Sequence, residues 1–186
     1  MFVNDCLYRG RPLEERAPVE QACYDFLDKL ELEYYRVDHE HAPSIEACHE
    51  VEKILGALIC KNLLLTNRQQ TEVYLLMMPG EKPFKTKLLA KQIGSTRLSF
   101  ATEEQMERLL GVTPGSVSVL ALMNDTNREV KLVIDEDLLK DEFIGVHPCL
   151  NSSTLKLKTE DMVQSIIPAT GHGFTKVDLP WVIEEE

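Results

Sequence analysis

The sequence lacks the patterns that mark membrane and secreted proteins. None of its apolar runs reaches the roughly 20 residues that a membrane-spanning helix requires. The segment from Met1 to Asp5 has no positively charged stretch followed by an apolar one, so we expect no signal peptide. These absences predict a cytoplasmic protein with no membrane contact.

Motifs for phosphate loops, dinucleotide binding and nucleophile elbows are also missing. The patterns G-x-x-x-x-G-K-[ST], G-x-G-x-x-G and G-x-S-x-G do not occur in the chain. The five cysteines are scattered and form no Cys-x-x-Cys pair, which argues against a zinc knuckle or a redox motif and favours reduced thiols. Cys60, next to Lys61, is either an activated thiol or, as we favour, an inert buried one. No covalent nucleophile is therefore predicted.

Positive charge is scarce. The chain has 20 Lys and Arg against 31 Asp and Glu, and its formal net charge is −11. A chain this acidic is not typical of a general nucleic-acid binder, because phosphate binding depends on Lys and Arg. The exception is the segment 82–97, which has no acidic residue and contains Lys82, Lys85, Lys87, Lys91 and Arg97. This segment is either a solvated helix face or a surface for a nucleic-acid backbone.

What is present predicts one α+β domain over residues 1–186. The length and the 44% hydrophobic content suit a single globular domain with a sizeable core. Helices are expected at 18–30, 44–55, 84–93 and 102–110, with a last one beginning near Thr159. Strands are expected at 33–37, 62–66, 72–78, 117–123, 130–135, 143–146 and 155–158. Ser44 is the expected N-cap of the second helix, and Thr102 with Gln105 forms a capping-box pattern.

Polar residues at tight turns and strand ends are the candidate functional groups. A lysine and an asparagine, Lys61 and Asn62, stand at the mouth of an apolar strand. A buried ammonium is costly unless it is paired or serves a ligand, although the Lys61 stem could also lie outside the strand and extend to water. Pro114-Gly115 is a strong turn signal. His147-Pro148 places an imidazole on a rigid turn, with a structural or a functional role.

Metal binding is the weaker interpretation of the other histidines. His39 and His41 share one face of a predicted strand and His49 follows, but no third ligand is evident. We therefore favour polar or surface histidines and predict no metal and no cofactor.

Taken together and in order, several segments resemble the YbaK/ProXp-ala family of freestanding prolyl-tRNA editing deacylases. The segments are Val37-Asp38-His39, Lys61-Asn62-Leu63-x-Leu65, Arg97-Leu98-Ser99-Phe100-Ala101, Leu110-Gly111-Val112-Thr113-Pro114-Gly115-Ser116-Val117 and Gly145-x-His147-Pro148-x-x-Asn151. The resemblance runs from about Phe26 to the helix after Thr159. It implies a mixed, largely antiparallel, barrel-like sheet with surrounding helices.

The resemblance also implies an activity and a set of site residues. The segments Arg97–Ala101 and Gly111–Val117 are more similar to the alanine-specific branch, so the implied reaction is hydrolysis of alanine mischarged on tRNA(Pro). The implied catalytic residues are Lys61, Gly115 and His147. The implied substrate-binding residues are Asn62, Arg97, Ser116, Gly145 and Asn151. The tRNA backbone is expected at Lys85, Lys87 and Lys91, and prolyl-tRNA synthetase is a possible partner. Family members often have Pro where this chain has Val119.

The implied reaction needs no protein nucleophile. An aminoacyl ester is already reactive, so positioning and electrostatic stabilisation are sufficient for attack by water. Lys61 would bind the phosphate or ribose of the terminal adenosine, backbone groups near Gly115 would hold the carbonyl and the amine, and His147 would shape the pocket or orient water. Two alternatives are a deacylase for Cys-, Ser- or Thr-bearing tRNA, and a non-catalytic module that binds tRNA or a synthetase.

Overall fold

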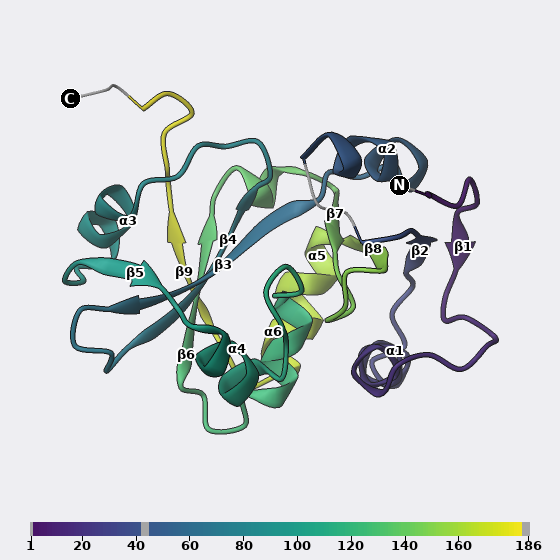
Figure 1. Cartoon of the computed structure of the whole chain (residues 1–186), viewed down its shortest axis with the longest axis horizontal. Helices are drawn as coiled ribbons and strands as arrows, with labels where there is room; N and C mark the ends of the chain where they lie inside the picture. Colours follow the sequence, from purple (N-terminus) through teal and green to yellow (C-terminus); the bar gives the residue numbers. More distant parts are fainter. Residues whose placement is uncertain (1, 42–44, 184–186) are drawn as a thin grey trace.

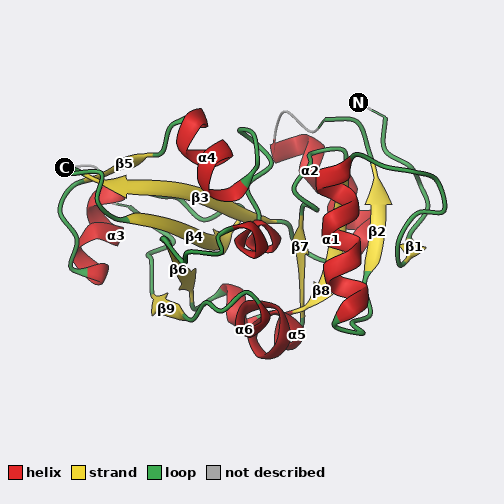
Figure 2. Ribbon diagram, turned by 90° about the horizontal axis from the view of Figure 1, so that it is seen from below, coloured by secondary structure: helices red, strands yellow, loops and turns green. Residues whose placement is uncertain are grey.

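The structure, a computed structural model, describes residues 2–41 and 45–183. Its strands form two sheets that lie side by side, with helices packed against both (Figures 1 and 2). The helices are Pro18–Lys29 (α1), Ile45–Leu55 (α2), Thr86–Ile93 (α3), Glu103–Leu110 (α4), Thr159–Asp161 (α5) and Ile167–Ala169 (α6). The strands are Tyr8–Arg9 (β1), Tyr35–Asp38 (β2), Cys60–Asn67 (β3), Val73–Pro79 (β4), Leu98–Phe100 (β5), Val130–Asp135 (β6), Phe143–Val146 (β7), Ser153–Lys158 (β8) and Phe174–Val177 (β9).

The strand order confirms the expected α+β class with a mixed, largely antiparallel arrangement. The larger sheet has the order β5-β3-β4-β6-β9 and the smaller one β1-β2-β8-β7. Only the β4–β6 and β6–β9 pairs among the named strands are parallel. Figure 2 shows α3 and α4 with the larger sheet and α1 and α2 with the smaller one. No helix within the described ranges is long and apolar enough to cross a bilayer.

The expected barrel-like closure is wrong, because the two sheets remain open. They meet at an isolated bridge between Ile59 and Gly145, where the Gly145 amide donates to the carbonyl of Leu58 at 2.8 Å. A Cβ at Gly145 would lie 3.1 Å from both the Ile59 Cα and a Leu55 methyl. Glycine therefore permits the close approach of the sheets, and a single bridge does not extend the hydrogen-bond ladder around them.

Local signals predicted most elements well. The Thr102 hydroxyl accepts from the Gln105 amide and the Gln105 side chain accepts from the Thr102 amide, so the expected capping box is confirmed. Gly94 and Gly111 end α3 and α4 in the left-handed conformation that favours glycine. The expected Ser44 cap lies outside the described residues.

The strand expected at 117–123 is wrong, because Val119–Asn124 forms a 3-10 helix. Its residues from Val119 to Leu122 are fully buried, and a short buried apolar run does not distinguish a strand from a helix. The Ser118 hydroxyl accepts from the Leu120 amide and so caps the 3-10 turn. The last helix begins at Thr159 as expected, and Met162–Ile166 joins α5 to α6 as a π-helical turn.

Lys82 is a buried structural residue and does not belong to the basic surface. Its amine lies 2.9 Å from both carboxylate oxygens of Asp135 and 2.9 Å from Asp137. Lys82 and Asp135 have no exposed surface, so each ion needs the other. The Trp181 ring lies over the same amine, with its centre 5.2 Å away. This ion pair anchors the loop between β4 and α3 to the end of β6.

Candidate active site

A hollow of about 320 Å³ brings together polar groups from three distant segments. Asn62 comes from β3, Gly115 from the turn after α4, and His147 from the end of β7. The remaining lining residues are Cys60, Leu63, Leu64, Phe100, Met106, Pro114 and Val117. The hollow therefore combines an apolar wall with a few convergent polar groups, as small-molecule sites commonly do.

The alternation of β3 separates two residues that are adjacent in the sequence. Successive side chains of a strand point to opposite faces, so Asn62 and Lys61 lie on different faces of β3. Asn62 lines the hollow, and its amide nitrogen lies 3.4 Å from the carbonyl oxygen of Cys60. Its buried oxygen Oδ1 has no hydrogen-bond partner among the described residues. A ligand donor in the hollow would satisfy this oxygen.

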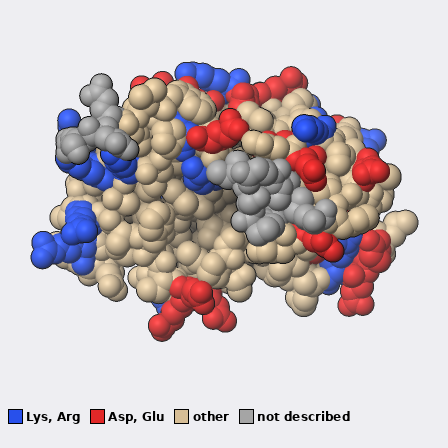
Figure 3. All heavy atoms as spheres, turned by 45° about the horizontal axis from the view of Figure 1, so that its top comes forward, with Lys and Arg blue, Asp and Glu red and all other residues tan. Residues whose placement is uncertain are grey.

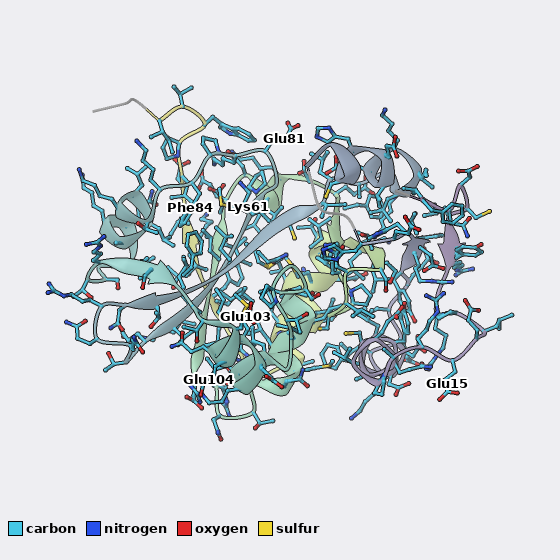
Figure 4. All side chains as sticks on the ribbon, viewed as in Figure 1. Glu15, Lys61, Glu81, Phe84, Glu103 and Glu104 are labelled. Carbon is cyan, nitrogen blue, oxygen red and sulfur yellow. The ribbon has the colours of Figure 1, made fainter. Side chains whose placement is uncertain are left out.

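Lys61 lines a second hollow, of about 170 Å³, which shares Cys60 and His147 with the first. The Lys61 amine donates to the Lys82 carbonyl at 2.9 Å, and no carboxylate within the described parts of the chain forms an ion pair with it. Desolvation by burial lowers the Lys61 pKa from its ordinary value. Figure 4 labels Lys61, Glu81 and Phe84 in the same region, around the upper part of β3. Lys61 thus lies beside the main hollow. Its hydrogen bond to the Lys82 carbonyl uses one of the three N–H donors of the ammonium, which leaves donors for a ligand.

The hydrogen bonds of His147 fix which ring nitrogen carries the proton. Nδ1 lies 3.1 Å from the carbonyl oxygen of Ser153, which can only accept, so Nδ1 carries hydrogen. The hydroxyl of Thr154 lies 3.4 Å from the same nitrogen. Burial lowers the His147 pKa to about 4, so the ring is neutral at pH 7. In a neutral ring with Nδ1–H, Nε2 is a hydrogen-bond acceptor.

The hydrogen bonds of a second histidine, His39, are consistent with this protonation of His147. His39 is buried, and its Nδ1 donates to the Glu40 carbonyl at 2.7 Å. Its Nε2 therefore accepts from the Thr154 hydroxyl at 2.8 Å. The Thr154 hydroxyl, which donates to His39, can then accept from the His147 Nδ1–H, so every donor in this network faces an acceptor. Sequence reasoning missed Thr154 and treated His39 as a possible metal ligand. The alternation of β8 places Thr154 on the face of Lys156 and Lys158, so the pattern gave no sign that Thr154 is buried.

His147→Ala should lower the single-turnover rate of the expected ester hydrolysis roughly 2- to 13-fold. This factor corresponds to the loss of one hydrogen bond to the substrate, which contributes about 0.5–1.5 kcal/mol. Because the His147 pKa is lowered to about 4, the ring protonates only well below neutral pH. We therefore expect pH–rate profiles of wild type and His147→Asn to have the same shape between pH 5 and 8. An inflection near pH 6.5 that disappears in His147→Asn would contradict a ring that is neutral near pH 7 and indicate acid–base catalysis.

The other predicted residues around Gly115 line a neighbouring hollow. Gly115 has φ +83°, which favours glycine, and a Cβ there would lie 3.7 Å from the Asn151 amide nitrogen. Ser116 and Asn151 are buried and line a hollow of about 270 Å³ together with His41. This hollow shares Pro114 with the main one. The Gly115 turn therefore separates the main hollow from the segment around Asn151.

Two predicted substrate-binding residues do not line these hollows. Arg97 is exposed just before β5, and Gly145 serves the contact between the two sheets. Cys60 does line the main hollow, but burial raises the pKa of its thiol to about 12. A thiol with this pKa remains protonated at pH 7, which supports the inert interpretation of Cys60.

The three histidines considered for metal binding have different surroundings. His49 bonds with Glu81 at 2.9 Å, His39 is bonded on both nitrogens, and His41 is exposed. Over residues 2–41 and 45–183 the structure has no group of three or more His, Cys, Asp or Glu side chains arranged to hold a metal.

The predicted tRNA-backbone lysines lie on α3 and directly before it. Lys85 precedes α3, and Lys87 and Lys91 lie on it; all three are exposed. They line an open hollow of about 760 Å³ with Pro180, Val182 and Ile183. Figure 3 shows Lys and Arg gathered at the left end, the side of α3 in Figure 1, and a broad uncharged surface beside it.

Comparison with known proteins gives consistent matches. A family model described as an aminoacyl-tRNA editing domain matches residues 39–164. A protein of Acetoanaerobium sticklandii described as prolyl-tRNA editing protein ProX is 33% identical over 160 residues, which cover 86% of this chain and 97% of that protein. The Danio rerio prolyl-tRNA synthetase associated domain-containing protein 1 is 28% identical over 155 residues, covering 82% of each. A crystal structure described as a candidate trans-editing enzyme for prolyl tRNA synthetase covers 88% of this chain and 98% of its own, with a TM-score of 0.66 at 19% identity, and supports the fold.

Proposed function

This chain belongs to the aminoacyl-tRNA editing domain family and is an aminoacyl-tRNA deacylase, and from that premise we propose that it hydrolyses alanine mischarged on tRNA(Pro). The observation that carries the proposal is the hollow in which Asn62, Gly115 and His147 converge. The Gly115 segment resembles the alanine-specific branch of the family. Its substrate is a tRNA, and its relatives connect it with prolyl-tRNA synthetase.

Each polar group of the hollow has a role in this proposal. The Asn62 oxygen and the His147 Nε2 are acceptors, which suit the ammonium of an aminoacyl ester. Backbone amides at the Gly115 turn hold the carbonyl oxygen as negative charge develops on it. Ser116 and Asn151 support that turn from the adjacent hollow. Lys61 reaches the ribose or phosphate of the terminal nucleotide from the other face of β3.

Water is the nucleophile in the proposed reaction. The thiol with a raised pKa at Cys60 is a poor nucleophile, and the ester needs none from the protein. The free hydroxyl of the substrate's own ribose lies next to the ester and helps to position the water. Protein groups then contribute by orientation and by stabilising the developing charge.

We also propose that residues 1–186 act as one editing domain. The segments outside the family match are tied to those within it. At the N-terminal side, β1 pairs with β2, and α1 contributes Cys23, Tyr24 and Leu27 to the main apolar core. At the C-terminal side, β9 pairs with β6.

The direct test is incubation of the purified protein with Ala-tRNA(Pro), with release of free alanine measured over time. We expect catalytic turnover without added synthetase. A protein that binds the tRNA but leaves the ester intact would be a non-catalytic binding module. Faster release of cysteine than of alanine from tRNA(Pro) would assign it to the cysteine-specific branch.

Charge reversal on α3 should weaken tRNA binding and reduce its salt dependence. Lys85→Glu, Lys87→Glu and Lys91→Glu each remove a cation that is proposed to neutralise one phosphate. The slope of log K against log salt should fall by roughly 1 for each phosphate that is no longer neutralised. Lys29→Glu, on an exposed lysine at the end of α1, is the matched control. Equal slopes for all four variants and wild type would place the tRNA elsewhere.

A further inference from the structure

The rim of the main hollow carries an exposed aromatic ring that the proposed chemistry does not use. Phe100, the last residue of β5, lines the hollow and is 59% exposed. Phe84 contacts it edge to face, with 6.3 Å between the ring centres. Phe84 in turn packs against the buried cluster that includes Leu65 and Leu98. A single exposed apolar residue is common on protein surfaces, but one that lines a site and is braced by a second ring suggests a ligand.

The strand register places Phe100 across the edge of β3 from the reacting groups. Cross-strand partners share a face, and Phe100 pairs with Leu65, so it lies on the face of Lys61 and Leu63. Asn62 lies on the opposite face. Because β5 pairs with β3 only from Leu65 onward, the described structure leaves the preceding part of this edge without a strand partner. The hollow is lined from both faces, by Asn62 and by Leu63, so it passes around the open edge.

We infer that Phe100, braced by Phe84, is the stacking platform for the terminal adenine of the tRNA acceptor end. The inference rests on the proposed function, and it follows from the connectivity of the substrate: one ribose joins the ester to the adenine. From Asn62 to Leu65, the partner of Phe100, β3 advances by roughly 10 Å, a span suited to one ribose between ester and base. Stacking on an aromatic ring is a common way to bind an unpaired base.

The charged groups around the platform fit the rest of the nucleotide. Lys61 shares the face of Phe100, where the ribose and the terminal phosphate of a stacked adenosine would lie. Lys85 directly follows Phe84 and precedes α3. The tRNA backbone leaving the platform would therefore continue towards Lys87 and Lys91. The amino acid, base and backbone are thereby assigned to three connected parts of one surface.

The test separates the base from the rest of the substrate. Adenosine and ribose 5-phosphate are titrated into the wild-type chain and into Phe100→Ala by calorimetry. Cleavage of 3′-O-alanyl-adenosine and of alanine methyl ester is measured in parallel. We expect Phe100→Ala to weaken adenosine binding and to raise the KM for alanyl-adenosine roughly 5- to 150-fold. Ribose 5-phosphate binding and cleavage of the methyl ester should not change.

Matched variants exclude a general effect of removing an aromatic ring. Phe100→Trp should retain adenosine binding, since indole also stacks. Phe2→Ala, which removes an exposed phenylalanine that does not line the main hollow, should behave as wild type. Adenosine affinity unaffected by Phe100→Ala, or an equal loss for methyl ester and alanyl-adenosine, would overturn the platform. Calorimetry measures adenosine binding and does not depend on hydrolysis. It would therefore still decide on the Phe100 platform if the chain proved not to hydrolyse Ala-tRNA(Pro).

Discussion

Lys61→Ala is expected to lower the single-turnover rate of Ala-tRNA(Pro) deacylation roughly 10- to 150-fold, a larger effect on this rate than that expected of His147→Ala. A hydrogen bond between a charged donor and its partner contributes about 1.5–3 kcal/mol. Loss of this energy in the transition state lowers the rate by the roughly 10- to 150-fold that we expect. Among the residues that the structure describes, the Lys61 amine has one hydrogen-bond partner, the Lys82 carbonyl, and its other donors are available to a ribose or phosphate.

The same structure predicts how the Lys61 variant should fold. Removing one hydrogen bond to a backbone carbonyl costs about 0.5–1.5 kcal/mol, so thermal unfolding should shift only modestly. The buried pair of Lys82 and Asp135 remains intact in this variant. Lys29→Ala, which removes an exposed lysine from α1, is the activity control. Wild-type turnover in Lys61→Ala would refute the assignment, and unfolding of the variant would make Lys61 a structural residue.

Selectivity is expected to follow side-chain size, with alanine removed fastest, serine or cysteine more slowly and proline negligibly. A synthetase pocket for proline rejects a smaller apolar amino acid by only about 1–3 kcal/mol, so a second site that admits the small one restores fidelity. Proline adds a ring that also includes the α-nitrogen. Fitting it into a close-packed pocket would cost about 1–3 kcal/mol in strain, or more. Rates with tRNA(Pro) charged in turn with Ala, Ser, Cys and Pro provide the measurement.

The structure identifies where the size limit can be changed. Val117 lines the main hollow, so Val117→Ala should widen it and raise the relative rate with larger amino acids. Val119 lies two residues later, fully buried at the start of the 3-10 helix and away from the hollow lining. Val119→Ala removes the same atoms from the core and should leave the rate order unchanged. Efficient removal of proline by the wild-type chain would end the editing hypothesis, since such an enzyme corrects nothing.

Features that depend on neighbouring residues were predictable, and features that depend on distant ones were not. Caps and turns were predictable because each involves residues only a few positions apart, as in the box formed by Thr102 and Gln105. The run at 117–123 was not predictable, because a buried apolar segment carries no period that distinguishes strand from helix. Lys82 looked like a surface lysine, and only its contacts with Asp135 and Asp137 showed its buried role.

By itself, the sequence determined the α+β class, most element positions and the segments that carry the family resemblance, with Asn62, Gly115 and His147 among their residues. Tertiary structure alone decided that these three share one hollow and that Lys61 approaches it from the opposite face of β3. It also decided the proton position on His147, through Ser153, Thr154 and His39. The physical reason is that strand pairing and hydrogen-bond networks join residues far apart in the chain, such as His39 and Thr154, which are 115 positions apart, whereas sequence periodicity reports only on neighbours.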